Sequence, residues 1–181
     1  MRYTAHGKGR ETSRLFFGLL PGAEAIRSIQ FHVDQCSEVT GKKVIADNFH
    51  ITLLFLGNIE NSTINNLCAE CDNISASSIE LTINEAGFWS KPGILWLGPE
   101  IIPAELLSLV GSLRKIARDR KLNPGKNKYH PHITLMRKVL SAPQQPIVKP
   151  FNWHAGSFSL VKSHTHPDGV QYQELASWPL L

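Results

Sequence analysis

The sequence has few cysteines, at positions 36, 68 and 71, and no apolar run that approaches a membrane-spanning length. An odd number of cysteines argues against a disulfide framework and favours reduced thiols in the cytoplasm. A transmembrane helix needs about 20 consecutive apolar residues, so we expect no membrane segment. Low-complexity segments and domain linkers are also missing. What remains is a globular chain of 181 residues, which is long enough to bury one core.

The first residues are polar and lack the apolar segment of a secretory signal. We therefore expect a flexible, solvated leader over residues 1–13 and a single domain over residues 14–181. No feature of the sequence requires an oligomer, so we expect a cytoplasmic monomer.

The formal net charge of +4 is modest, but the charge is unevenly distributed. Between residues 114 and 138 the only acid is Asp119, and nine residues are Lys or Arg, at positions 114, 115, 118, 120, 121, 126, 128, 137 and 138. Such a run is either a solvated helix face with a loop or an attractor for a polyanion. Charge alone does not separate these interpretations, but the run leads directly into the second copy of a repeated His-Ile-Thr-Leu motif.

Each half of the chain, about residues 14–93 and 94–181, shows the same order of expected elements. An apolar strand that ends at a proline comes first, followed by an amphipathic helix, a strand that contains His-Ile-Thr-Leu, and a hairpin. The expected strands cover residues 14–20, 49–57, 79–90, 94–99, 130–140, 156–164 and 170–178, and the expected helices lie around residues 26–36, 62–72 and 103–120. The strands over 79–90 and 94–99 should pair across a Lys-Pro-Gly turn.

This order predicts an α+β fold with two lobes. Two antiparallel sheets, related by a pseudo-twofold axis, should face each other across a central cleft, with the helices on the outside. The two His-Ile-Thr-Leu strands should then meet in that cleft.

The repeated motif carries the chemistry. Alternate residues of a strand point to the same face, so His50 and Thr52 should project together, as should His132 and Thr134, while the intervening apolar residues point into the core. Near neutral pH one imidazole can hold a proton while the other accepts one, and threonine hydroxyls can donate to phosphate oxygens. The set supplies a base, an acid and oxyanion donors, which is what metal-free hydrolysis of a phosphodiester needs. The residues alone do not decide which histidine is the acid.

Simpler interpretations compete with this one. One His in an apolar strand is more often a packed or surface residue, but two copies in corresponding places are hard to assign to packing. An RNA-binding module without turnover is a second alternative. A third is a zinc hydrolase, for which no nearby carboxylate or Cys ligand is evident. Its histidines would be His130, His132, His164 and His166. The Cys68-Ala-Glu-Cys71 pattern has no second pair and is a weak redox or zinc signal.

The segments "RLFFGLLP", "ADNFHITLLFLG", "FWSKPGILWLG", "YHPHITLMR" and "FNW" resemble, in this order, the 2H phosphoesterase superfamily. More narrowly, they resemble the bacterial LigT-like RNA 2′,3′-cyclic phosphodiesterases, also named 2′–5′ RNA ligases. The similarity runs from about residue 14 to the C-terminus, and both His-x-Thr-x motifs fit without departure. It implies hydrolysis of a 2′,3′-cyclic phosphate to a 2′-phosphate, without a metal or cofactor, on RNA or nucleotides with cyclic phosphate ends. Ligation of 2′–5′ linked ends, the reverse chemistry, needs no different residues.

The resemblance also implies a role for each motif residue. His50 would be the proton donor and His132 the proton acceptor, while Thr52 and Thr134 would contact the phosphate. A basic residue shortly after the second motif, here Arg137, would assist. Strict alternation places Arg137 on the face opposite Thr134, so a bulge or a strand end would have to redirect it.

Some aromatic residues are further candidates. Phe17, Tyr129 and Trp153 could stack on a nucleobase, although aromatic residues in strands more often belong to the core. His130 shares parity with His132 and could line the cleft entrance or remain exposed.

Overall fold

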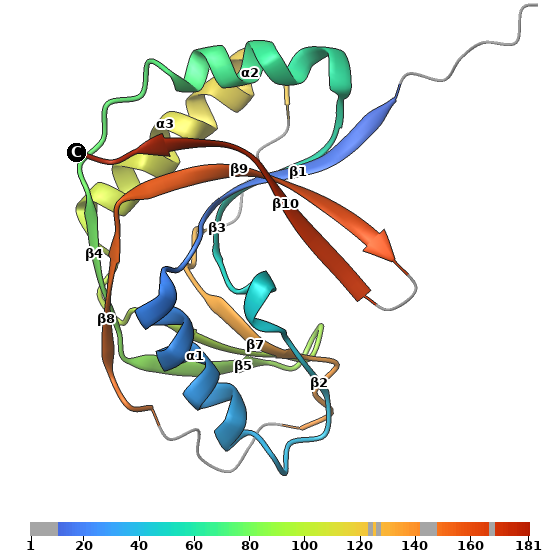
Figure 1. Ribbon diagram of the computed structural model, residues 1–181, viewed down its shortest axis with the longest axis vertical. Coiled ribbons are helices and arrows are strands. Elements are labelled where there is room, and N and C mark those ends of the chain that lie inside the picture. Colours follow the sequence, from blue (N-terminus) through green and yellow to red (C-terminus); the bar gives the residue numbers. More distant parts are fainter. Residues whose placement is uncertain (1–10, 123–124, 126–127, 142–147, 167–168) are drawn as a thin grey trace, which may run out of the picture.

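The computed structural model describes residues 11–122, 125, 128–141, 148–166 and 169–181, drawn in colour in Figure 1. In chain order its elements are β1 (Thr12–Leu19), α1 (Ala23–Gln35), β2 (Lys42–Lys43), the 3₁₀ helix η1 (Ala46–Asn48), β3 (Ile51–Glu60), the 3₁₀ helix η2 (Asn61–Thr63), α2 (Ile64–Cys71), β4 (Ile79–Ile83), β5 (Glu85–Trp89), β6 (Ile94–Gly98), α3 (Ala104–Asp119), β7 (Ile133–Arg137), β8 (Phe151–Ala155), β9 (Ser157–His166) and β10 (Gly169–Pro179). The leader expected over residues 1–13 falls mostly outside the described residues, and β1 already includes residues 12 and 13.

One large antiparallel sheet organises the molecule. Its strand order is β10-β9-β1-β3-β7-β6-β5, with β2 paired to β7. Within the described residues, β3 and β7 share the single pair Ile51–Ile133. The sheet divides at this pair into an upper lobe with β1, β3, β9 and β10 and a lower lobe with β2, β5, β6 and β7 (Figure 1). The predicted two-lobed α+β fold is therefore confirmed, but the strands of both lobes belong to one sheet, whose two parts join at this residue pair.

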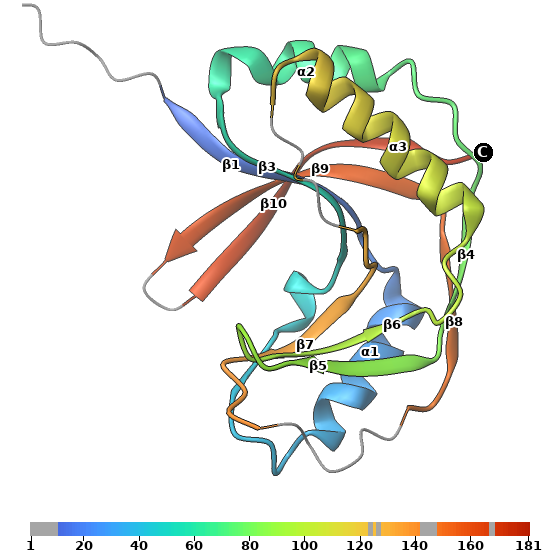
Figure 2. The same ribbon diagram turned by 180° about the vertical axis from the view of Figure 1, so that it is seen from behind.

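A small second sheet and the helices complete the fold. Strands β4 and β8 pair with each other and run between the lobes at the left edge of Figure 1. Helix α1 covers the lower lobe and packs on β7 and β8, while α2 and α3 cover the upper lobe (Figures 1 and 2). Segments of both sequence halves thus build each lobe. In the upper lobe, β9 and β10 from the second half extend the sheet beside β1. In the lower lobe, β5 from the first half pairs with β6 from the second.

The hairpin expected over residues 79–99 forms only in part. Strand β5 pairs with β6 across the Lys-Pro-Gly turn, as predicted. The segment 79–83 was expected to belong to the same hairpin, but as β4 it pairs with β8. Its alternate residues Ile79, Leu81 and Ile83 are fully buried, so the side-chain pattern was recognisable while the pairing partner was not.

Helix α3 shows how the basic stretch is distributed. Its buried stripe is that of an amphipathic helix, with Leu106, Leu109, Val110, Leu113 and Ala117 in the core. At its C-terminal end, Arg120 donates two hydrogen bonds of 2.8 Å to the Glu70 carboxylate on α2. Lys115 pairs with Asp119 on the exposed face. Part of the positive charge is therefore a helix face with local partners.

No helix among the residues that the structure describes is long and apolar enough to cross a membrane. All three cysteines are free thiols. Burial raises the pKa of Cys71 to about 12 and also raises the pKa of Cys68, so both thiols of the C-x-x-C pattern stay protonated at neutral pH.

Candidate active site

The two His-Ile-Thr-Leu motifs meet where the lobes join. Ile51 and Ile133 are Cα partners in an antiparallel pair, and both side chains are completely buried. The residues immediately before and after each isoleucine point to the opposite side of the sheet. Because the strands are antiparallel, His50 and Thr52 of one strand come to the same side of this junction as Thr134 and His132 of the other. The convergence expected from the sequence is thus a direct consequence of one backbone pairing.

Each of the two histidines is oriented in the same way. The Nδ1–H of His50 donates to the carbonyl of Asn48, two residues earlier, over 2.8 Å. The Nδ1–H of His132 donates to the carbonyl of His130, also two residues earlier, over 2.9 Å. A carbonyl oxygen can only accept, so Nδ1 carries the proton in both rings. In the neutral form, each Nε2 is left with a lone pair for chemistry, and that of His50 lies 3.1 Å from the hydroxyl of Thr52.

Aromatic rings enclose both imidazoles. Phe16 and Tyr172 lie 4.9 and 5.0 Å from His50, measured between ring centroids. Trp89 meets the ring of His132 edge to face at 4.6 Å. Both histidines remain partly exposed, but these rings replace water over part of each imidazole, and desolvation disfavours the charged form of a histidine.

The histidine pKa values reflect this enclosure. The pKa of His50 is lowered to about 4, mainly by burial. The hydrogen bond to Asn48 opposes this shift, and electrostatic interactions with Arg137 and His132 add to it. Burial also lowers the pKa of His132, assisted by His130 and Arg137 and opposed by its own backbone hydrogen bond. Both rings are therefore neutral near pH 7 in the free protein. Arg137 contributes to both shifts, and it lines a pocket together with Tyr172, whose ring contacts His50.

A β-bulge explains how Arg137 reaches that pocket. Along β6 and β7 the Cα partners are Leu97–Ile133, Trp96–Thr134 and Leu95–Met136. Leu135 is therefore an extra residue in β7, and an extra residue reverses the facing of the side chains that follow it. Both Leu135 and Met136 are buried, while Arg137 is exposed. The bulge removes the conflict with strict alternation.

The three aromatic residues proposed to stack on a base are placed differently. Phe17 and Trp153 are 0% and 2% exposed and belong to the core, so neither presents a face to a nucleobase. Tyr129 packs against the same core, and its buried hydroxyl has no hydrogen-bond partner among the described residues. Phe16, next to Phe17, contacts His50 instead. Sequence alternation alone could not decide which of two adjacent phenylalanines faces the cleft.

The remaining histidines do not form a metal site in the described part of the chain. Nowhere within it do three or more His, Cys, Asp or Glu side chains group closely enough to hold an ion. His130 packs edge to face on Trp96 at 4.6 Å, and Nε2 of His164 lies 3.2 Å from the side-chain oxygen of Gln173. The side chain of His166, the fourth member of the zinc alternative, lies outside the described set.

Several residues of the site were not identified from the sequence. Trp89 and Tyr172 flank the two histidines, and Asn48 supplies the carbonyl that orients His50. Asn48 and Trp89 lie within the segments "ADNFHITLLFLG" and "FWSKPGILWLG" that carry the family resemblance, so proximity in sequence was an available signal. Tyr172 comes from the distant β10, and no local pattern could have shown that it reaches His50.

The chain is similar in sequence and structure to known phosphoesterases. A family model described as LigT-like phosphoesterase matches residues 19–96. The RNA 2′,3′-cyclic phosphodiesterase of Escherichia coli (strain K12) is 31% identical over 173 residues, which cover 94% of this chain and 98% of that protein. The crystal structure of E. coli LigT complexed with 3′-AMP matches with a TM-score of 0.85 at 29% identity, covering 94% of this chain and 99% of the other. TT0787 of Thermus thermophilus shares the fold, with a TM-score of 0.81 at 22% identity and coverage of 92% and 97%.

Proposed function

This chain belongs to the LigT-like phosphoesterase family, and we propose that it is an RNA 2′,3′-cyclic phosphodiesterase that opens a terminal cyclic phosphate to a 2′-phosphate. The observation that carries the proposal is the convergence of two oriented His–Thr pairs on one side of the Ile51–Ile133 junction. A general base and a general acid for hydrolysis must lie on opposite sides of one phosphorus atom. Two histidines from facing strands, each with Nε2 available, can satisfy that requirement.

The proposed reaction assigns one proton transfer to each imidazole. Nε2 of His132 removes a proton from a water molecule as its oxygen attacks phosphorus. The bond from phosphorus to the 3′ oxygen breaks, and Nε2 of His50 gives its proton to that leaving oxygen. The product carries the phosphate on the 2′ oxygen and a free 3′ hydroxyl. The choice of His50 as the acid follows the family resemblance, because the hydrogen bonds of the two histidines are alike.

Substrate binding supplies the protonation state that His50 needs. In the free protein its pKa of about 4 keeps the ring neutral near pH 7. A bound phosphodiester brings a negative charge, which favours the charged imidazolium and raises the pKa. Near pH 7 an acid formed in this way is present only when substrate is bound.

Thr52, Thr134 and Arg137 are proposed to bind the phosphate. Thr134 is almost fully buried beside the junction, and the Thr52 hydroxyl already lies 3.1 Å from Nε2 of His50. Hydroxyl donors can stabilise the charge that develops on the non-bridging oxygens as water adds. The guanidinium of Arg137 carries a permanent positive charge and can donate to two of those oxygens at once.

A direct test is to incubate the protein with an RNA that ends in a 2′,3′-cyclic phosphate and to identify the position of the product phosphate. The expected product is a 2′-phosphate, formed by the wild-type protein and not by His132→Ala. A 3′-phosphate product, or equal turnover by His132→Ala, would contradict the proposal. We further propose that the enzyme is a cytoplasmic monomer, consistent with its three free thiols, and light scattering of the purified protein tests the oligomeric state.

A further inference from the structure

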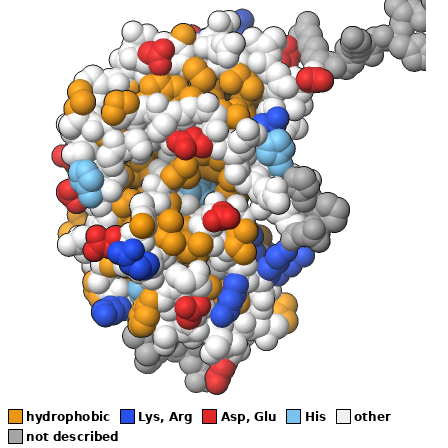
Figure 3. All heavy atoms as spheres, viewed as in Figure 1, with side chains coloured by type: hydrophobic (Ala, Val, Ile, Leu, Met, Phe, Trp, Pro, Cys, Tyr) orange, Lys and Arg blue, Asp and Glu red, His pale blue; other side chains and the backbone are white. Residues whose placement is uncertain are grey.

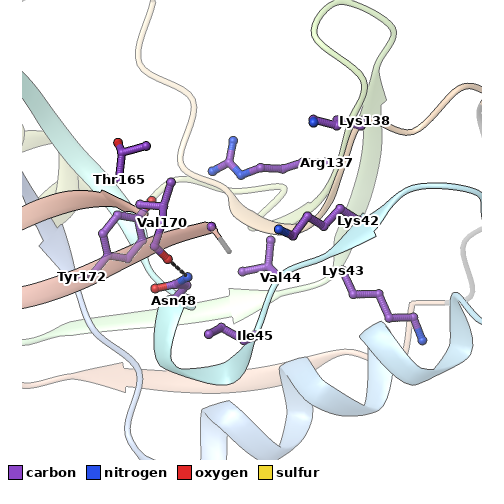
Figure 4. Close-up of a pocket in the computed structure, with 11 residues that line it drawn as sticks. Lys42, Lys43, Val44, Ile45, Asn48, Arg137, Lys138, Thr165, Val170 and Tyr172 are labelled. Atoms are coloured by element: carbon purple, nitrogen blue, oxygen red, sulfur yellow. Dashed lines mark hydrogen bonds between the residues drawn. The ribbon is translucent and has the colours of Figure 1, made fainter. Parts of the chain in front are cut away.

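We propose that a basic pocket beside His50 binds the phosphodiester on the 5′ side of the terminal nucleotide, so that RNA strands are preferred over mononucleotides. This inference rests on the proposed function and concerns a different part of the substrate. The pocket has a volume of about 360 Å³, within the range of small-ligand pockets. It lies between the lobes, where β2, η1 and the end of β7 face the β9–β10 hairpin (Figures 1 and 4).

The lining of the pocket is strongly positive. None of its eleven residues is acidic, and four are cations, namely Lys42, Lys43, Arg137 and Lys138. In Figure 4, Lys42 and Arg137 extend toward the β9–β10 hairpin, whereas Lys43 points away. Figure 3 shows Lys and Arg side chains over the same part of the lower lobe, around β2. Such a positive lining attracts an anionic phosphodiester and gives little advantage to a neutral nucleobase.

Two of the cations are held directly opposite each other. Lys42 and Arg137 are Cα partners on the neighbouring strands β2 and β7. Like charges in such cross-strand positions repel and destabilise a sheet. An anion that binds beside these two side chains is attracted by both charges, which favours a charged ligand at this position. Lys138, in the left-handed conformation at φ 56°, continues the basic edge beyond the strand.

The pocket is continuous with the catalytic centre. Tyr172 lines it and also lies edge-on to the ring of His50 at 5.0 Å. Asn48 lines it too, accepts the hydrogen bond from His50, and donates from Nδ2 to the carbonyl of Val170 over 2.7 Å (Figure 4). Arg137 acts on both histidines from the pocket wall. A ligand that is bound at the histidines and extends toward Tyr172 and Asn48 therefore enters this pocket.

The chemistry of an RNA end matches this arrangement. With the cyclic phosphate between the histidines, the strand leaves the terminal ribose through its 5′ carbon, and the next charged group is the 5′ phosphodiester. The apolar side of the pocket, which includes Val44 and Val170, can contact the sugar and base. A nucleoside 2′,3′-cyclic phosphate has no second phosphate group for Lys42 and Lys138, so it leaves this part of the pocket unused.

The experiment compares kcat/KM for adenosine 2′,3′-cyclic phosphate with that for a tetranucleotide that ends in the same cyclic phosphate. Wild type, Lys42→Ala, Lys138→Ala and a control, Lys115→Ala, are measured. Lys115 is an exposed lysine of α3 that pairs with Asp119, outside the pocket. The wild type should prefer the tetranucleotide, and Lys42→Ala should reduce that preference about tenfold, the scale of one hydrogen bond to a charged group. Lys115→Ala should retain it.

Salt dependence gives a second readout. Loss of one phosphate contact on a single strand should reduce the slope of log kcat/KM against log salt by about 0.7 for the tetranucleotide. The inference would be overturned if Lys42→Ala and Lys138→Ala kept the wild-type preference for the tetranucleotide, or if they lost kcat/KM equally on both substrates. In either case, turnover of the cyclic phosphate by wild type would still uphold the proposed function. No turnover of either substrate by wild type would reject the proposed function, and the inference with it.

Discussion

Ile51 and Ile133 are Cα partners at the point where the two lobes join, and both are completely buried. This pair fixes the relative position of the two motifs, because His50 and Thr52 flank one isoleucine and His132 and Thr134 flank the other. The proposed catalytic group is therefore anchored by backbone pairing between two strands rather than by a flexible loop. The predictions that follow test the side chains around this anchor.

The histidines should each be indispensable. We expect His50→Ala and His132→Ala to reduce kcat on a cyclic phosphate substrate at least about 10²-fold, the usual contribution of a positioned acid or base. His154→Ala is the matched control, since this exposed histidine on β8 contacts Glu80 and lies away from the junction. A folded His132→Ala protein with full activity would contradict the proposed base.

The threonines should matter less than the histidines. Thr52→Ala and Thr134→Ala each remove one hydrogen bond to a charged phosphate, which costs about 1.5–3 kcal/mol. Steady-state kinetics should show a loss in kcat/KM of that size, smaller than the loss from either histidine variant if the threonines only bind. A loss in Thr52→Ala as large as that in His50→Ala would mean that this hydroxyl takes part in proton transfer.

Arg137 should influence both the phosphate and the imidazoles. Its positive charge lowers the pKa of His50 and of His132, so Arg137→Ala should raise both pKa values, as measured by NMR titration of the ring protons. The same variant should lose kcat/KM, and Arg137→Lys should recover only part, because lysine lacks the planar pair of donors. Unchanged histidine titrations in Arg137→Ala would show that the bulge does not bring the guanidinium to the site.

The pH dependence should be displaced to the acidic side. The profile of kcat/KM reports the free enzyme, in which the base must be neutral and the acid protonated. As the pH falls the base becomes protonated, and as the pH rises the acid loses its proton, which gives a bell. Since burial lowers both histidine pKa values below 6.5, both limbs should lie below that pH. The kcat profile should peak at higher pH, because bound phosphate raises the imidazole pKa values. A kcat/KM maximum above pH 7 would contradict this account.

The roles of the two histidines can be separated by the same measurement. His50→Ala should lose the alkaline limb if His50 is the acid, and His132→Ala should lose the acidic limb. The opposite pattern would reverse the assignment, which the hydrogen bonds alone do not decide.

Turnover should not depend on a metal ion. The proposed acid, base and phosphate donors are all side chains of this chain, so activity should survive exhaustive treatment with EDTA. Loss of activity that zinc restores would support the zinc hydrolase alternative instead. Metal analysis of the purified protein provides an independent check.

Sequence patterns predicted the elements well where the spacing of side chains within one helix or strand carried the information. The amphipathic pattern of α3 and the alternation of the first His-Ile-Thr-Leu strand appear in the structure as expected, because burial on one face requires a fixed residue spacing. In β7 the alternation is lost, because Ile133, Thr134, Leu135 and Met136 are all buried around the bulge. The same pattern correctly predicted that Ile51 and Ile133 are buried. It failed for β4, whose spacing was right but whose partner is β8, since a strand's pattern does not specify which edge it joins.

The sequence by itself thus determined the α+β content and the two His–Thr pairs, because side-chain periodicity is a property of a few consecutive residues. Only the tertiary structure decided that Leu135 forms a bulge that turns Arg137 to the site, that Phe16 rather than Phe17 contacts His50, and that Tyr172 closes the basic pocket. These features depend on register and on contacts between segments far apart in the sequence, such as Asn48 and Val170, which are 122 residues apart. Such contacts form when the whole core packs, and no local pattern encodes them.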